Sequence, residues 1–195
     1  MYYDEVHPDK VSPKDYVNDP NIKIMTWGHY STKAKGLPPI EQYYRELVGH
    51  WQEAVGRYVL VNTEVDRHPT GGATNRLYCW TSAMANRYTA MSSHRPDKAN
   101  VPRETYLGDG LIRTFMEQTD FYRMSPNSNL KYGGTLYVLA SDASSYIAYS
   151  NNASQNMGIR NLKAGTYLLR WFDTVDGDTV EQMVAASAGD QAWPT

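Results

Sequence analysis

The sequence is poor in cysteine, in phenylalanine and in net charge. Cys79 is the single cysteine among 195 residues, which excludes an intramolecular disulfide and a zinc site built from several cysteines. The formal net charge is −2, from 19 Lys+Arg and 21 Asp+Glu. No cluster of basic residues is present, and binding to duplex nucleic acid depends on such clusters. The composition therefore argues against a nucleic-acid partner.

Long apolar runs and several catalytic motifs are also missing. No run approaches the roughly 18 apolar residues of a membrane-spanning helix. Residues 1–5 have neither the basic region nor the apolar core of a signal peptide. Gly71-Gly72 lacks the lysine of a phosphate-binding loop, and no G-x-S-x-G motif occurs. Cys79 lies in a helical-looking run, where a buried, inert thiol is expected.

Aromatic residues with a polar group are abundant. The chain has 16 Tyr and 5 Trp but 3 Phe. Such rings line wet clefts and stack on sugars through their flat faces. A tyrosine-rich core is the alternative interpretation, and composition alone does not separate the two.

The first 120 residues alternate β-favouring runs with amphipathic helical patterns. Residues 1–20 are polar, contain three prolines and predict a loop. Strands are expected at 22–27, 58–61 and 88–91, and helices at 40–55, 74–87 and 104–118. The apolar run 58–61 is typical of a parallel strand buried on both faces. The pattern predicts an α/β domain over residues 1–124.

Beyond residue 125 the sequence changes to short strands separated by turn residues. Strands are expected at 136–140, 145–149, 157–159, 167–172 and 180–184. Asp176-Gly177 indicates a hairpin turn, since the length and distal glutamate of a calcium-binding EF-hand are absent. The spacing predicts a small antiparallel β-sandwich over 130–195, joined to the α/β domain through 125–129.

Polar and aromatic residues follow each of the three predicted strands of the α/β domain. In α/β folds, functional groups gather at the carboxyl ends of the strands. We therefore expect one substrate site formed by Trp27, His29 and Tyr30 after the first strand, Asn62, Glu64, Asp66, Arg67 and His68 after the second, and His94 and Arg95 after the third.

Glu64 is the main catalytic candidate because it follows the apolar run and should project from the rim of the sheet. A carboxylate there can act as a nucleophile toward an anomeric carbon or as a general acid/base. The alternative is a structural ion pair with Arg67 or Arg95. Asp66, two residues on, would share the side of Glu64 in an extended segment and would bind substrate hydroxyls or Arg67.

The three histidines after the strands raise the question of a metal site. His29, His68 and His94, together with Asp66, include residue types that bind metals, but their spacing follows no recognised metal motif. Hydrogen bonding to a polar substrate is the favoured interpretation. The sequence therefore predicts neither a metal nor a cofactor.

Several segments resemble bacterial apiosidase-like glycoside hydrolases. The strands 146–149 and 167–172, with the turn Ala164-Gly165, resemble the β-sandwich at the C-terminus of that family. Residues 58–64 are similar to its seventh barrel strand, which ends in a catalytic glutamate. Residues 108–124 resemble its last barrel helix and the bridge into the sandwich. The resemblance covers about residues 20–195.

The resemblance implies the C-terminal part of a (β/α)8 TIM barrel, about its last three β/α units, followed by the β-sandwich. It implies that Glu64 is the nucleophile of a retaining mechanism, and it makes His29, Tyr30, Trp80 and His94 candidates for sugar contacts. The acid/base carboxylate of such barrels lies near the end of the fourth strand, whereas this chain begins at about the sixth.

The implied function is cleavage of glycosidic bonds in plant or algal polysaccharide by a hydrolase of which this chain is a portion. Its partners would be an oligo- or polysaccharide and an N-terminal half-barrel, in cis or in trans. The chain alone is expected to be inactive, and the parent protein to be secreted or periplasmic. The alternative function is a binding module whose sandwich recognises a glycan or a protein without catalysis.

Overall fold

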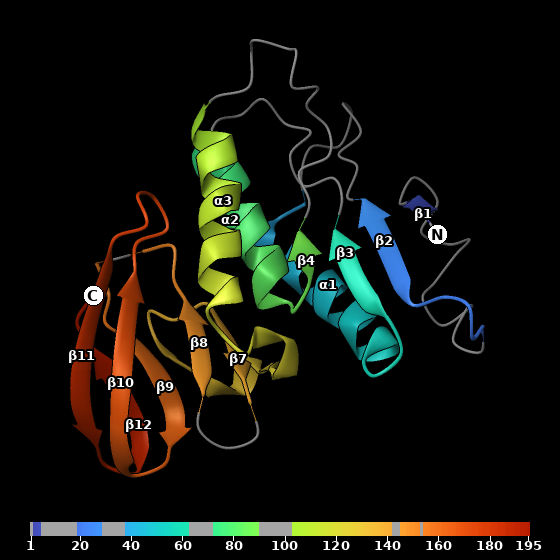
Figure 1. Cartoon of the computed structure of the whole chain (residues 1–195). Coiled ribbons are helices and arrows are strands. Elements are labelled where there is room, and N and C mark those ends of the chain that lie inside the picture. Colours follow the sequence, from blue (N-terminus) through green and yellow to red (C-terminus); the bar gives the residue numbers. More distant parts are fainter. Residues whose placement is uncertain are drawn as a thin grey trace. The chain divides into compact units, whose positions relative to one another are not determined.

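The computed structural model describes residues 2–4, 19–28, 38–62, 72–89, 103–141, 145–152 and 154–195. The chain divides into two compact units, Met1–Gly110 and Leu111–Thr195. The division falls inside helix α3 (Arg103–Glu117). Figure 1 shows the helices and parallel strands of the first unit and the antiparallel strands of the second. The fold is therefore mixed, with helices, a parallel sheet and antiparallel sheets.

The first unit contains a four-stranded parallel sheet in the order β1-β2-β3-β4 (Figure 1). Its strands are β1 (Tyr2–Asp4), β2 (Ile24–Gly28), β3 (Val59–Asn62) and β4 (Tyr88–Thr89). Helix α1 (Ile40–Ala54) connects β2 to β3, and α2 (Gly72–Met84) connects β3 to β4. Strands consecutive in the chain are neighbours in the sheet, so right-handed crossovers carry both helices to the same face.

Strand β1 corrects the prediction of a loop over residues 1–20. Tyr2, Tyr3 and Asp4 pair in parallel with Thr26, Trp27 and Gly28 of β2. An edge strand of this length is held by backbone hydrogen bonds to its neighbour. It therefore needs no apolar run, and the sequence pattern gives no sign of it.

Helix α1 follows the predicted amphipathic pattern and covers one face of the sheet. Ala54 in its last turn packs with Met25 of β2 and Leu60 of β3, and the partly buried Trp51 and Tyr58 lie against this cluster. The next turns toward the amino end also present buried side chains, namely Tyr43, Tyr44 and Leu47. Apolar burial on this one stripe is what holds the helix to the sheet.

Helix α2 ends three residues before the predicted boundary at 87. Asn86 has φ of +56°, the left-handed conformation that commonly ends a helix. The backbone N–H of Asn86 donates to the carbonyl of Ala83, and that of Arg87 to the carbonyl of Ser82, which together form a Schellman motif. The turn places the Arg87 side chain, 1% exposed, in the interior, where Nη2 donates to the Leu47 carbonyl at 3.3 Å.

The opposite face of the sheet is apolar and largely exposed. Leu60 is 5% exposed, whereas its neighbour Val59 is 45% exposed. Val59 pairs with Ile24, which is 54% exposed, and two residues along, Val61 pairs with Tyr88, which is 45% exposed. The prediction that strand 58–61 is buried on both faces is therefore wrong. The parallel pairing predicted for it is confirmed.

The second unit is built from short antiparallel strands, as predicted. Its strands are β5 (Ser125–Pro126), β6 (Lys131–Gly133), β7 (Tyr137–Ala140), β8 (Tyr146–Tyr149), β9 (Met157–Leu162), β10 (Gly165–Phe172), β11 (Thr179–Ala186) and β12 (Gly189–Trp193). They form sheets in the orders β5-β7-β8, β12-β9-β6 and β10-β11. Two 3₁₀ turns, Phe121–Arg123 and Ser128–Leu130, lie near its beginning. The predicted joint at 125–129 lies within this unit.

A cluster of buried side chains connects the three antiparallel sheets. Val138 of β7, Ile159 and Leu162 of β9 and Ala186 of β11 are buried together. Partly buried side chains around them include Leu130, Ala140, Tyr146, Ala148, Tyr167 and Trp193. Because all three sheets contribute side chains, the arrangement is compatible with the predicted β-sandwich.

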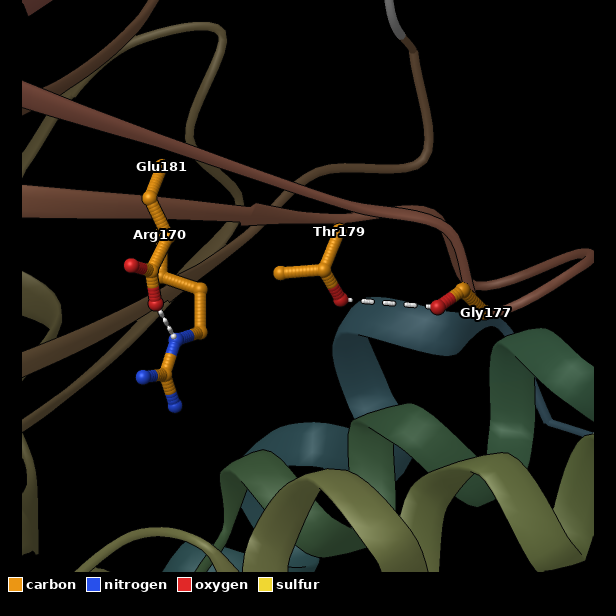
Figure 2. Close-up of polar contacts among 4 residues, drawn as sticks. All are labelled: Arg170, Gly177, Thr179 and Glu181. Carbon is orange, nitrogen blue, oxygen red and sulfur yellow. Dashed lines mark hydrogen bonds and ion pairs between the residues drawn. The ribbon is translucent and has the colours of Figure 1, made fainter.

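The β10–β11 hairpin has the turn that the sequence predicts at Asp176-Gly177. Gly177 has φ of +86°, a conformation that favours glycine, and its N–H donates to the carbonyl of Asp173 at 3.0 Å. Across the strands, Arg170 Nε donates to Glu181 Oε1 at 2.8 Å, as Figure 2 shows. Phe172 packs against Phe115 of α3, with ring centroids 4.9 Å apart.

Candidate functional site

The carboxyl ends of β2, β3 and β4 lie level with one another at one edge of the sheet (Figure 1). Trp27 pairs with Asn62, and Asn62 pairs with Thr89. Because all three strands are parallel, the segments that follow them leave from the same edge. Most of the predicted site residues therefore follow strands that end level with one another.

Most of the predicted site residues lie outside the described residues. These are His29, Tyr30, Glu64, Asp66, Arg67, His68, His94 and Arg95. Trp27 and Asn62 are described by their backbone alone, at the ends of β2 and β3. In sequence, Glu64 is two residues beyond the last residue of β3.

Trp80 has a different setting from the one expected of a sugar contact. It lies in the middle of α2 and is 2% exposed, among the buried residues of that helix. Stacking on a sugar needs an exposed ring face. The buried Trp80 therefore offers no ring face to a sugar.

The side chain of Tyr78 in α2 contacts the segment at the start of α1, which the sequence pattern does not reveal. Its hydroxyl donates to the carbonyl of Pro38, two residues before the first residue of α1, and its ring lies 5.0 Å from that of Tyr43. Burial raises the pKa of Tyr78 above its ordinary value. The contact ties the start of α1 to α2, and α1 begins after the segment that follows β2.

The part of the chain that the structure describes has neither a metal-binding cluster nor a membrane-spanning helix. There, no group of three or more His, Cys, Asp or Glu residues is arranged to hold a metal ion. None of the described helices has the length and apolar character needed to cross a bilayer. Cys79 is buried, as predicted.

The second unit presents an exposed aromatic group of its own. Tyr122 is 57% exposed, and the guanidinium carbon of Arg123 lies 5.3 Å from the centre of its ring. Tyr132 in β6 is 37% exposed. The tryptophans of this unit, Trp171 and Trp193, are half-buried. Tyr122 is therefore the aromatic side chain of this unit with the most exposed surface.

No family model, curated protein or solved structure matches the chain.

Proposed function

We propose that the chain is part of a glycoside hydrolase, with a β/α sheet that forms one wall of a (β/α)8 barrel and Glu64 as the catalytic nucleophile. The observation that carries the proposal is the unreversed strand order β1-β2-β3-β4, all parallel. In sequence, Glu64 follows β3 by two residues, and barrels of this kind hold their catalytic groups at the carboxyl ends of the strands.

The strand order favours a barrel over a doubly wound sheet. A doubly wound sheet reverses its strand order at a switch point and carries helices on both faces. Here the order runs in one direction, and α1 packs on the face formed by Met25 and Leu60. The opposite face, with Ile24, Val59 and Tyr88, is apolar. It has the character of a barrel interior, which is filled by branched and other apolar side chains.

The exposure of that face supports the proposal that further β/α units cover it. Parallel sheets are normally covered on both faces, yet Ile24 and Val59 are 54% and 45% exposed. Within the described residues, β1 and β4 each have one strand neighbour. A further set of β/α units, in cis or in trans, would pair with both edges and cover the apolar face.

The proposed chemistry needs that complement for a second reason. A retaining glycosidase uses two carboxyl groups about 5–5.5 Å apart, one as nucleophile and one as acid/base. We assign the nucleophile to Glu64 and the acid/base to the complementing units. Polar residues that follow the strands, such as His29, Tyr30 and Asp66, would bind sugar hydroxyls of a plant or algal polysaccharide. The parent enzyme would act outside the cytoplasm, without a cofactor.

A complementation assay tests this function. The full chain is mixed with the N-terminal half-barrel of an apiosidase-like hydrolase, and the release of p-nitrophenol is measured over a panel of p-nitrophenyl glycosides. We expect turnover by the mixture and none by either part. Glu64→Gln should abolish turnover. Glu41→Gln, the same chemical change in the first turn of α1, should leave it unchanged.

Two results would overturn the proposal. One is a complex that forms in size-exclusion chromatography but hydrolyses no glycoside of the panel. The other is equal turnover by the parent chain and Glu64→Gln. Either would remove the catalytic role of Glu64.

The exposed Tyr122 supports a second function, a glycan-binding module. Tyr122 is 57% exposed, and Arg123, whose guanidinium lies over the ring, adds donors for sugar hydroxyl groups. Binding of the full chain to a glycan array that is lost in Tyr122→Ala and retained in Glu64→Gln would favour this function. Retention of the binding in Tyr122→Ala would exclude Tyr122 as the contact.

A further inference from the structure

The outer edge of the β10–β11 hairpin has unused hydrogen-bonding groups. Within the described residues, β11 has β10 as its ladder partner and no strand on its other side. The N–H of Asp173 donates to the carbonyl of Asp178 at 2.9 Å, so the bonded pairs alternate from that pair along the ladder. The alternation points the backbone groups of Thr179, Glu181, Met183 and Ala185 outward.

Strand β11 lacks the features that normally protect an edge. It has eight residues in continuous register with β10 and contains no proline, glycine or lysine. Its one charged residue is Glu181, whose carboxylate already lies 2.8 Å from Arg170 Nε (Figure 2). Natural edge strands are usually short, bulged or charged, because an open edge recruits another strand.

We propose that β11 pairs with β11 of a second copy of this chain, antiparallel, across a two-fold axis at Met183. The axis is perpendicular to the sheet, so the side chains of two facing residues must point to the same face of the sheet. Their residue numbers are therefore both odd or both even. With Met183 at the axis, the outward groups of Glu181 meet those of Ala185 of the second copy. The strand is thus complementary to itself, which is the requirement for a closed symmetric dimer.

The exposed side chains favour this register over one centred on Glu181. Leu168 and Met183 are cross-strand partners and are 53% and 64% exposed. Pairing at Met183 joins them into one apolar row, Leu168-Met183 of one copy followed by Met183-Leu168 of the other. An axis at Glu181 would set two carboxylates opposite each other, which is destabilising. The register at Met183 keeps each Glu181 beside its own Arg170.

Sedimentation equilibrium of the full chain over a wide concentration series tests the proposal. We expect the mass to rise from 22.1 kDa toward twice that value. Met183→Lys should raise the dissociation constant at least about tenfold, because it places two ammonium groups at the axis. Val175→Lys is the matched control, since Val175 is 62% exposed but lies in the hairpin turn. Its dissociation constant should be unchanged.

Cross-linking locates the axis independently. Facing Cα atoms in a bonded antiparallel pair are about 5.5 Å apart, within the range of a disulfide. Met183→Cys should therefore give a covalent dimer on mild oxidation, and Val175→Cys should give none. A chain that stays monomeric throughout, a Met183→Lys variant that dimerises like the parent chain, or open polymers in place of dimers would overturn the proposal.

Discussion

The one-sided covering of the parallel sheet can be tested with two neighbouring residues. Leu60 and Val59 are adjacent in β3 but point to opposite faces, and their side chains are 5% and 45% exposed. Leu60 packs with Met25 and Ala54 beneath α1. We predict that Leu60→Ala strongly destabilises the first unit, whereas Val59→Ala has a small effect.

The magnitudes follow from burial. Truncating a buried leucine costs about 2–5 kcal/mol, because the transfer term and the cavity term add. Val→Ala removes two methyl-sized groups, each contributing about 0.8 kcal/mol when fully buried. With Val59 45% exposed, about half of that contribution remains, so the cost should be below about 1 kcal/mol.

The chain carries its own reporter for the first unit. Cys79 is the single cysteine, lies in α2 and is 3% exposed. Its rate of modification by a soluble thiol reagent follows the free energy of opening of the surrounding structure. At about 1.4 kcal/mol per factor of ten, Leu60→Ala should speed modification at least about 30-fold, and Val59→Ala no more than about fivefold.

Equal effects of the two variants would refute the reasoning, because they would mean that both faces of β3 are buried. The same would follow from a large effect of Val59→Ala alone. Addition of the complementing half-barrel supplies the matched contrast. The proposed complex would bury Val59, so the proposal predicts that Val59→Ala weakens association.

Three further variants test separate parts of the structure. Gly49 lies in α1, and a Cβ added there meets no atom within 4 Å. Gly49→Ala should therefore raise the urea midpoint of unfolding by the equivalent of about 0.5–1 kcal/mol. An unchanged midpoint would mean that the added methyl group is not accommodated freely. Thr135→Val should cost about 1–3 kcal/mol in the same assay, because Thr135 Oγ1 donates to the carbonyl of Gly158 at 2.9 Å and accepts from its N–H at 3.0 Å; a neutral effect would contradict those bonds. Burial raises the pKa of Tyr78 above 10.0, so the unfolded chain loses that proton first and stability falls as the pH rises past about 10. Tyr78→Phe should therefore show a shallower loss of melting temperature above that pH, and identical slopes would contradict the assignment.

The regular elements with strong periodicity could be predicted from the sequence. Helix α1 occupies Ile40–Ala54 against a prediction of 40–55, and α3 occupies Arg103–Glu117 against 104–118. Both have an apolar stripe at helical spacing, which tertiary packing then uses. Strands β10 and β11 could also be predicted, because a β-favouring run precedes the turn at Asp176-Gly177 and another follows it.

Short strands held by their backbone could not be predicted. Strand β12 (Gly189–Trp193) pairs with β9 through a ladder that is interrupted between Gly189 and Gln191. Its sequence has no β-branched residue, so its pairing depends on β9 and not on local preference. Strand β1, Tyr2–Asp4, likewise depends on pairing with its neighbour β2. The end of α2 also depends on backbone conformation, the positive φ of Asn86.

The common carboxyl end of β2, β3 and β4 could be predicted from the sequence, whereas most of the candidate residues lie outside the described residues. Apolar runs followed by polar residues locate the carboxyl ends of the strands, and the register of Trp27 with Asn62 sets those ends level. The burial of Trp80 corrects its assignment as a sugar contact, because a tryptophan in a helix has the same sequence signature whether it faces the core or a cleft. The exposure of the face with Val59 could not be predicted either, since an apolar run does not show which elements cover it.

Trapping of the covalent intermediate tests the central claim most directly. The chain and the complementing half-barrel are incubated with 2,4-dinitrophenyl 2-deoxy-2-fluoroglycosides matching the sugars that the mixture hydrolyses, and the labelled peptide is identified by mass spectrometry. A retaining nucleophile retains the fluorosugar as an ester. We predict one fluoroglycosyl group on Glu64 and none in Glu64→Gln. A label on another carboxylate, or turnover of the substrate with no label on Glu64, would contradict the account.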